Sequence, residues 1–192
     1  MMLEKKQTVI RNNFSIFGMS LTQALVVTIF GVMAAIGSMA LKLPLHIPGH
    51  RGLFIMLALT ACCIMIRKPG AGTLAGFIGS FVTVFVAPGA KGIFAFSDYM
   101  LPGIVMDVFV SLIPMLVSKW YMIGTAAGLA HVSKLLAMYV LGITLNLPMT
   151  FLSLGLGAVL LSHLITGFTG GALAYFVCKR VAFLRNMSLK WK

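Results

Sequence analysis

Long apolar runs separated by short polar segments dominate the pattern of this chain. The first run, residues 18–41, contains no charged residue and is closed by Lys42. A helix of about 24 residues at about 1.5 Å per residue covers the ~30 Å hydrocarbon core of a bilayer. Five further apolar runs follow at about 53–66, 71–86, 101–117, 121–143 and 151–177. The pattern predicts one all-α integral membrane domain over residues 1–192, a bundle of six transmembrane helices.

Composition supports the same class. Hydrophobic residues make up 60% of the chain and charged residues only 9%, whereas soluble domains carry about 25% charged residues. The three cysteines (Cys62, Cys63 and Cys178) all lie within or at the end of apolar runs, as small buried residues do. The first apolar run is too long for a cleaved signal peptide.

The charge balance indicates orientation. Fifteen Lys and Arg stand against three acids, a net charge of +12, but the basic residues lie between apolar runs, which argues against a nucleic-acid surface. With a cytoplasmic N-terminus, the outer segments hold three basic residues (Lys42, Arg51 and Lys91). The inner segments then hold eleven: Lys5, Lys6, Arg11, Arg67, Lys68, Lys119, Lys179, Arg180, Arg185, Lys190 and Lys192. The positive-inside rule therefore predicts that both termini are cytoplasmic.

Small residues form a stripe along the first predicted helix. They recur at helical spacing and comprise Ala24, Thr28, Gly31, Ala35 and Ser38, with Ala34 beside them. In lipid, such a seam allows another helix to approach closely. Two interpretations stay open: the stripe packs against other helices of this chain, or it docks a partner membrane subunit.

Four ionisable residues fall at membrane depth, where charges are costly and usually functional. These are Asp107 in the fourth run, His131 and Lys134 in the fifth, and His163 in the sixth. His131 and Lys134 are three positions apart and share a helix face. We expect Asp107 and Lys134 to face one central cavity, as an ion pair or with a substrate between them; a purely structural pair is the alternative.

The predicted outer loops supply further candidates for a binding site. Besides the four membrane residues, the candidates are His50, Arg51, Lys91, Asp98, Tyr99 and Asn146. Basic side chains suit a ligand with an anionic group, and the aromatic residues Phe94, Phe96 and Tyr99 suit a planar ring. A plain surface role for these loops is the alternative.

No motif indicates an enzyme or a cofactor. The Gly-x-Ser-Gly of membrane serine proteases is missing, since Phe81 follows Gly79-Ser80, and no H-E-x-x-H or nucleotide-binding loop is present. His46 and His50 are four apart, but Pro48-Gly49 between them opposes the helix that would align them on a metal. Any ATP-driven step would need another subunit.

The whole pattern resembles a known family. It combines six short spans, cytoplasmic termini, polar outer loops and a small-residue first helix with Gly31-x-x-x-Ala35 and Ala34-x-x-x-Ser38. The family is the substrate-binding S components of energy-coupling factor transporters, prokaryotic importers of vitamins and micronutrients in the cytoplasmic membrane. The resemblance implies capture of a small molecule from outside and docking of the first helix on a transmembrane T component driven by two cytoplasmic ATPases. His46-Ile-Pro-Gly also looks like the start of nickel and cobalt S components, so a metal or corrinoid substrate is a second possibility.

Two other classes compete with this interpretation. A stand-alone secondary transporter would use Asp107, His131, Lys134 and His163 as a proton relay. In a structural subunit of a larger membrane complex, the small-residue stripe would still have a role, and the outer loops would bind no ligand.

Overall fold

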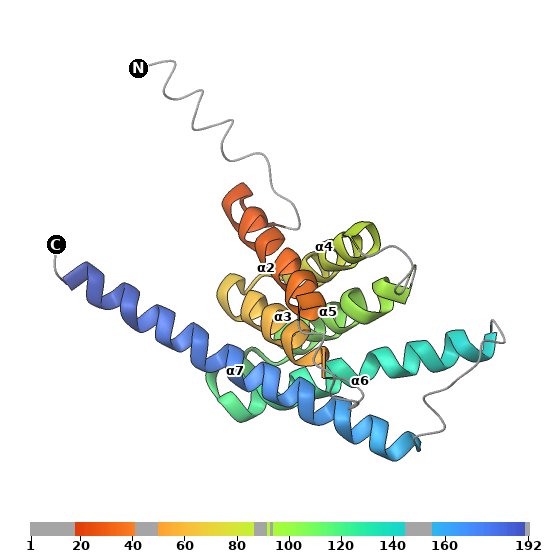
Figure 1. Ribbon diagram of the computed structural model, residues 1–192. Helices are drawn as coiled ribbons and strands as arrows, with labels where there is room; N and C mark the ends of the chain where they lie inside the picture. Colours follow the sequence, from red (N-terminus) through yellow and green to blue (C-terminus); the bar gives the residue numbers. More distant parts are fainter. Residues whose placement is uncertain (1–17, 41–49, 87–91, 93, 145–154, 191–192) are drawn as a thin grey trace.

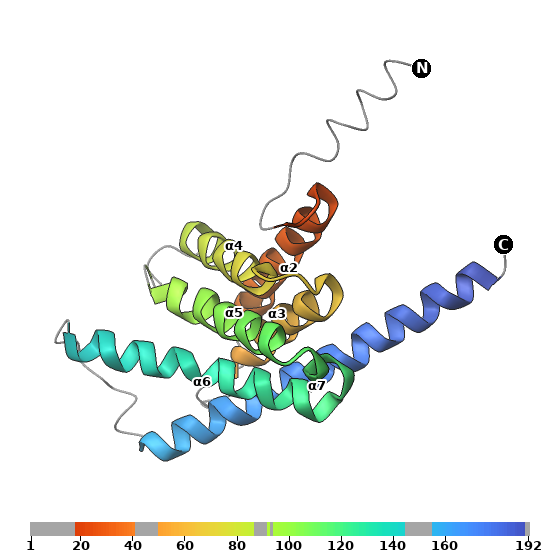
Figure 2. The same ribbon diagram turned by 180° about the vertical axis from the view of Figure 1, so that it is seen from behind.

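A computed structural model describes residues 18–40, 50–86, 92, 94–144 and 155–190. Within these ranges the chain is helical, without a β-strand, and successive helices run in alternating directions (Figures 1 and 2). The elements are α2 (Leu21–Ala40), α3 (Gly52–Ile66), α4 (Ala71–Val86), α5 (Phe94–Leu112), the short 3₁₀ helix η1 (Pro114–Ser118), α6 (Trp120–Thr144) and α7 (Leu156–Lys190). The all-helical prediction is confirmed.

Four of the helices are long and apolar enough to cross a membrane: α2, α5, α6 and α7 up to Ala182. Helices α3 and α4 are apolar but have only 15 and 16 residues, which is about 24 Å of helix at most. Helix α3 lies inside the bundle, whereas α4 lies at its edge and exposes Phe77, Phe81 and Phe85. In particular, α3 packs against α2, α4, α5, α6 and α7, which explains its almost wholly apolar sequence.

A reciprocal pair of hydrogen bonds sets the start of α2. The Ser20 hydroxyl accepts from the Gln23 N–H, and the Gln23 side chain accepts from the Ser20 N–H. This is the capping box S-x-x-Q, which satisfies two backbone donors at a helix start. It places the beginning of the helix three residues inside the predicted 18–41 run.

Glycines bring α4 and α5 into close contact. A Cβ added at Gly76 would lie 2.5 Å from the Tyr99 carbonyl oxygen, and one at Gly103 would lie 2.3 Å from the Gly72 oxygen. No other residue type fits at such distances. The contact fixes the position of the first two turns of α5, which carry Asp98 and Tyr99.

Small residues also make the crossing of α6 and α7. A Cβ added at Gly171 would lie 2.4 Å from that of Ala127, and one at Gly167 would lie 2.7 Å from that of His131. Beyond this crossing the two helices diverge, and Figure 2 shows their far ends well separated. His131, Lys134 and His163 lie at the start of this divergence.

The fourth predicted span differs most from the structure. It was expected at 101–117, but α5 covers Phe94–Leu112, and the chain bends before Pro114. A proline cannot continue the hydrogen bonding of a helix interior, so the helix ends there and η1 begins. Upstream, the expected outer loop Phe94–Met100 forms the first turns of α5 instead. In the sixth run, the described helix begins only after Gly155, whose φ is +81°.

The small-residue stripe is covered by the chain itself. Ala24, Gly31, Ala34, Ala35 and Ser38 are buried and Thr28 is half-buried, because this side of α2 faces α3 and α4. A Cβ at Gly31 would lie 2.6 Å from the Ala75 oxygen of α4. Of the two interpretations left open by the sequence, the structure favours a packing face within the bundle.

Candidate functional site

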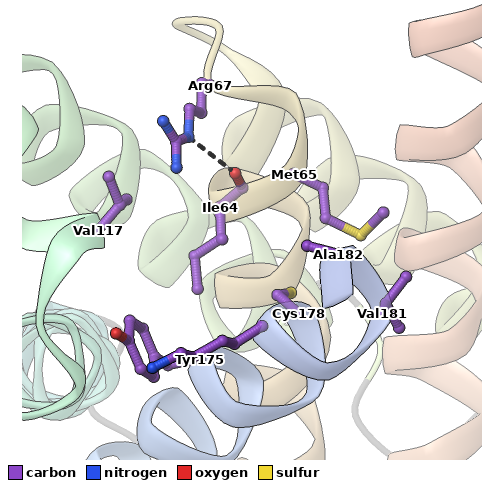
Figure 3. Close-up of a pocket in the computed structure, with 9 residues that line it drawn as sticks. Ile64, Met65, Arg67, Val117, Tyr175, Cys178, Val181 and Ala182 are labelled. Carbon is purple, nitrogen blue, oxygen red and sulfur yellow. Dashed lines mark hydrogen bonds between the residues drawn. The ribbon is translucent and has the colours of Figure 1, made fainter. Parts of the chain in front are cut away.

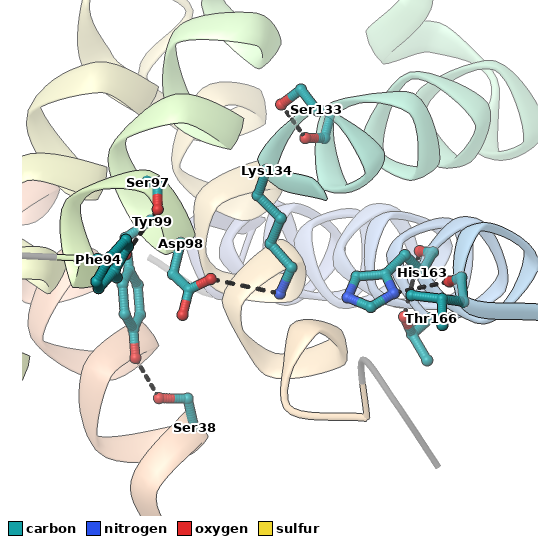
Figure 4. Close-up of polar contacts among 11 residues, drawn as sticks. Ser38, Phe94, Ser97, Asp98, Tyr99, Ser133, Lys134, His163 and Thr166 are labelled. Carbon is teal, nitrogen blue, oxygen red and sulfur yellow. Dashed lines mark hydrogen bonds and ion pairs between the residues drawn. The ribbon is translucent and has the colours of Figure 1, made fainter. Parts of the chain in front are cut away.

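A buried ion pair joins α5 to α6. The Lys134 ammonium lies 3.8 Å from an Asp98 carboxylate oxygen, and the two residues are only 6% and 2% exposed. Figure 4 shows the Lys134 side chain reaching from its helix toward Asp98. In an apolar bundle, two such charges are retained together only when they compensate each other.

Two histidines lie beside this ion pair. The rings of His131 and His163 are stacked, with centroids 5.0 Å apart and planes 24° from parallel, and both residues are buried. His163 Nδ1 lies 2.8 Å from the Val159 carbonyl oxygen. Since a carbonyl only accepts, Nδ1 carries a hydrogen, and in the neutral ring Nε2 is an acceptor. Figure 4 shows this second nitrogen on the side of the Lys134 ammonium.

Two further polar groups line the same region on α2 and α5. Ser38 and Tyr99 share a hydrogen bond between their hydroxyl groups, and both residues are buried. Pro102 lies within α5 and has no N–H, so the Asp98 carbonyl receives no helical hydrogen bond from that position. Because the Ser38 hydroxyl also donates to the Ala35 carbonyl at 2.9 Å, Tyr99 is the donor in the bond between the two hydroxyl groups.

The start of α3 closes the cluster from another side. A Cβ added at Gly52 would lie 1.8 Å from His131 Nε2, so the imidazole rests directly on the backbone there. His50 and Arg51, just before this glycine, are half-buried. The structure thus places His50, Arg51, Asp98, Tyr99, His131, Lys134 and His163 at one end of the bundle. We call this the Lys134 cluster.

Asp107 is not a member of the cluster, which corrects the expected Asp107–Lys134 pair. Its carboxylate accepts hydrogen bonds from the Gly72 N–H at 2.9 Å, the Thr73 N–H at 2.7 Å and the Thr73 hydroxyl at 2.7 Å. These donors belong to the first turn of α4, whose N–H groups lack partners within the helix and favour a negative charge. Because α5 begins at Phe94, Asp107 lies near its far end, beside Arg67 and Lys68.

Three candidates fall outside the described residues: Lys91, Asn146 and His46. Among the described residues, no group of three or more His, Cys, Asp or Glu side chains is placed to hold a metal ion. The weak metal alternative based on His46 and His50 stays a prediction, because His46 lies outside the described residues.

Two surface pockets lie at the opposite end of the bundle, around Arg67. One, of about 530 Å³, lies between α3, η1 and α7 (Figure 3). The other, of about 400 Å³, lies on the second side of Arg67 and reaches Asp107 and Pro114. The Lys134 cluster lies at the other end, where Lys134 pairs with Asp98 and the two histidine rings stack.

Sequence reasoning missed the role of Asp98 as the partner of Lys134, and of Ser38 as a neighbour of Tyr99. The sequence did contain part of the signal for the position of Asp98. Gly92 precedes an uninterrupted helix-compatible run, and a Pro at position 102 is tolerated in a membrane helix. Extending the helix to Phe94 would have moved Asp98 from a loop into the bundle.

Comparison of the chain with protein-family models, with curated proteins and with solved structures finds no match.

Proposed function

We propose that this chain is a membrane-embedded substrate-binding subunit of an energy-coupling factor type importer, with the Lys134 cluster as its binding site. The observation that carries the proposal is the Lys134–Asp98 ion pair, buried with two stacked histidines among apolar helices. Ionisable groups inside a membrane bundle mark substrate or ion sites far more often than simple packing.

The chemistry of the cluster indicates the class of ligand. Lys134 donates, and Asp98 and His163 Nε2 accept. A small polar molecule with an anionic group would replace Asp98 as the partner of Lys134, and the ring of Tyr99 would suit a planar part. A vitamin or vitamin precursor meets both requirements.

Orientation and partners belong to the same proposal. The basic residues Arg67, Lys68, Lys119 and Lys179 gather at the end opposite the Lys134 cluster, so the cluster would face outside and both termini the cytoplasm. A T component that docks on α2 would meet its exposed ridge, since the small-residue stripe is covered. That ridge consists of Leu21, Leu25, Ile29, Met33 and Ile36.

Ligand retention tests the proposal. The protein is purified in mild detergent and denatured, and the supernatant is examined by mass spectrometry. We expect a vitamin-like molecule that is lost in Lys134→Ala and Arg51→Ala but kept in Lys119→Ala, a change at an exposed lysine just before α6. An empty supernatant, together with no ATPase or T component in a pull-down, would contradict the proposal.

A stand-alone proton-coupled transporter is the second candidate, supported by the His131–His163 stack beside the ion pair. Its relay would use Asp98, because Asp107 lies at the other end. Purified protein in liposomes distinguishes the two: uptake driven by a pH gradient, without any ATPase, would favour this alternative.

A further inference from the structure

The larger pocket at the Arg67 end combines an apolar floor with a cationic rim. Ile64, Met65, Val117, Cys178 and Val181 form most of its lining, and Arg67 and Lys179 are its two cationic residues. Met65 and Val181 are about half exposed, so the apolar floor continues onto the outer surface of the bundle. Such a pocket matches a molecule with a negative head and a hydrocarbon tail.

Arg67 is held in a defined position on this rim. Its backbone is left-handed, with φ +50°, at the end of α3, and its Nε donates to the Ile64 carbonyl at 3.2 Å. Figure 3 shows the guanidinium above Ile64, with its terminal nitrogens directed away from that bond. These nitrogens form a planar fork that suits phosphate oxygens.

The described basic residues outnumber the described acids at this end of the bundle. Among the described residues the acids are Asp98 and Asp107. Asp98 pairs with Lys134 at the other end. Asp107 lies in the neighbouring pocket, where the start of α4 holds it. Arg67, Lys68, Lys119 and Lys179 therefore leave this end of the bundle positive.

Aromatic residues around the pocket indicate the level of a membrane surface. The Tyr175 hydroxyl donates to the Ser118 carbonyl at 3.1 Å, and Lys179 lies over the Tyr175 ring at 5.9 Å. Trp120 and Tyr121 are exposed next to Lys119. Tyr and Trp gather where hydrocarbon meets headgroups, and basic pockets between helices on the cytoplasmic side bind acidic lipid headgroups.

We propose that the pocket between α3, η1 and α7 binds an anionic phospholipid, with its phosphate on Arg67 and Lys179 and an acyl chain along Ile64, Met65 and Val181. This site is independent of the Lys134 cluster and of the proposed transport function. It would anchor α7 against α3 in a bilayer that contains acidic lipids.

Fluorescence quenching by brominated lipid tests this site on the full chain. Of the two tryptophans, Trp120 follows Ser118, whose carbonyl accepts from the pocket residue Tyr175, so Trp191→Phe leaves it as the single reporter. The protein is reconstituted in phosphatidylcholine vesicles with increasing brominated phosphatidylglycerol. We expect stronger quenching than with brominated phosphatidylcholine at the same fraction.

Charge variants identify the residues responsible. Arg67→Gln and Lys179→Gln should each weaken the preference for phosphatidylglycerol roughly fivefold, while Lys119→Gln, an equally charged neighbour outside the pocket, should keep it. If Arg67→Gln does not fold, because position 67 has a left-handed backbone, Lys179→Gln by itself tests the proposal. Equal losses of the preference in all three variants, or no loss in any of them, would overturn the proposal. Displacement of the lipid by excess glycerol phosphate would also overturn it, because that result would indicate a site for free phosphate.

Discussion

Two acids of this sequence, Asp98 and Asp107, were candidates for the binding site, and the structure shows how position decides what a carboxylate does. Asp98 faces a lysine inside the bundle, and Asp107 accepts three hydrogen bonds from the start of another helix. Both are buried, but the first compensates a side-chain charge and the second satisfies backbone donors. They should therefore respond differently to substitution.

Asp98→Asn should destabilise the protein by about 3 kcal/mol, because the Lys134 ammonium loses its charge partner in a buried site. Thermal unfolding in detergent measures the change. Asp98→Asn with Lys134→Met should recover most of the loss, since a buried pair replaced by apolar groups costs little. If the double variant is as unstable as the single one, the ion pair is not the cause.

Asp107→Ala should cost about 2 kcal/mol, because it leaves the Gly72 and Thr73 N–H groups without their acceptor. Thr73→Val removes only the hydroxyl bond and should cost about half as much. Neither change should alter ligand retention at the Lys134 cluster. Loss of ligand in Asp107→Ala, at a temperature where the variant is folded, would support the earlier Asp107–Lys134 hypothesis instead.

At the scale of elements, close helix contacts position the cluster. The α4–α5 contact at Gly72, Gly76 and Gly103 places Asp98 and Tyr99, and the α6–α7 crossing places His131 and His163. Without hydrophobic drive between helices in lipid, such small-residue contacts supply much of the association energy. Enlarging one of them should affect both packing and the site.

Gly76→Ala should destabilise the protein by about 2 kcal/mol, because the added methyl group would overlap the Tyr99 carbonyl and force α4 and α5 apart. The matched control is Gly157→Ala on α7, where the same methyl group meets nothing within 4 Å. That control should be neutral or slightly stabilising, since alanine favours a helix. Thermal unfolding of both variants measures the difference in stability. Equal destabilisation by Gly76→Ala and Gly157→Ala would contradict the role given to the α4–α5 contact.

At the scale of the whole molecule, the two ends of the bundle differ in chemistry. One end holds the Lys134 cluster, and the other holds Arg67, Lys68, Lys119 and Lys179 beside two open pockets. The alternating helices bring the start of α2 and the end of α7 to the basic end (Figure 1). A single orientation in the membrane would therefore place the Lys134 cluster and these basic residues on opposite sides.

Cysteine labelling tests this orientation at Ser118, the last residue of η1, and at Thr144, the last residue of α6. In a background without Cys62, Cys63 and Cys178, a membrane-impermeant maleimide should label Thr144→Cys in intact cells and Ser118→Cys only after permeabilisation, as the positive-inside rule requires. Both positions are exposed, so access alone distinguishes them. The reverse pattern would invert the proposed topology.

The sequence by itself determined the helical class, the number of apolar segments and most of their bounds. These properties are local: hydrophobic run length and stop signals act within a few residues, as the agreement at 53–66 and 71–86 against α3 and α4 illustrates. It also identified His131, Lys134 and His163 as buried ionisable residues, because such residues are conspicuous in an apolar run.

Only the tertiary structure decided which groups meet. Asp98 and Lys134 are separated by η1 and most of two helices, and their pairing depends on where α5 starts and how the glycines of α4 hold it. The same is true of Asp107, whose partners on α4 lie more than thirty residues away, and of the stripe on α2, which α3 and α4 cover. A pattern along one helix shows which face is special, but the neighbour that occupies that face is set by the packing of the others.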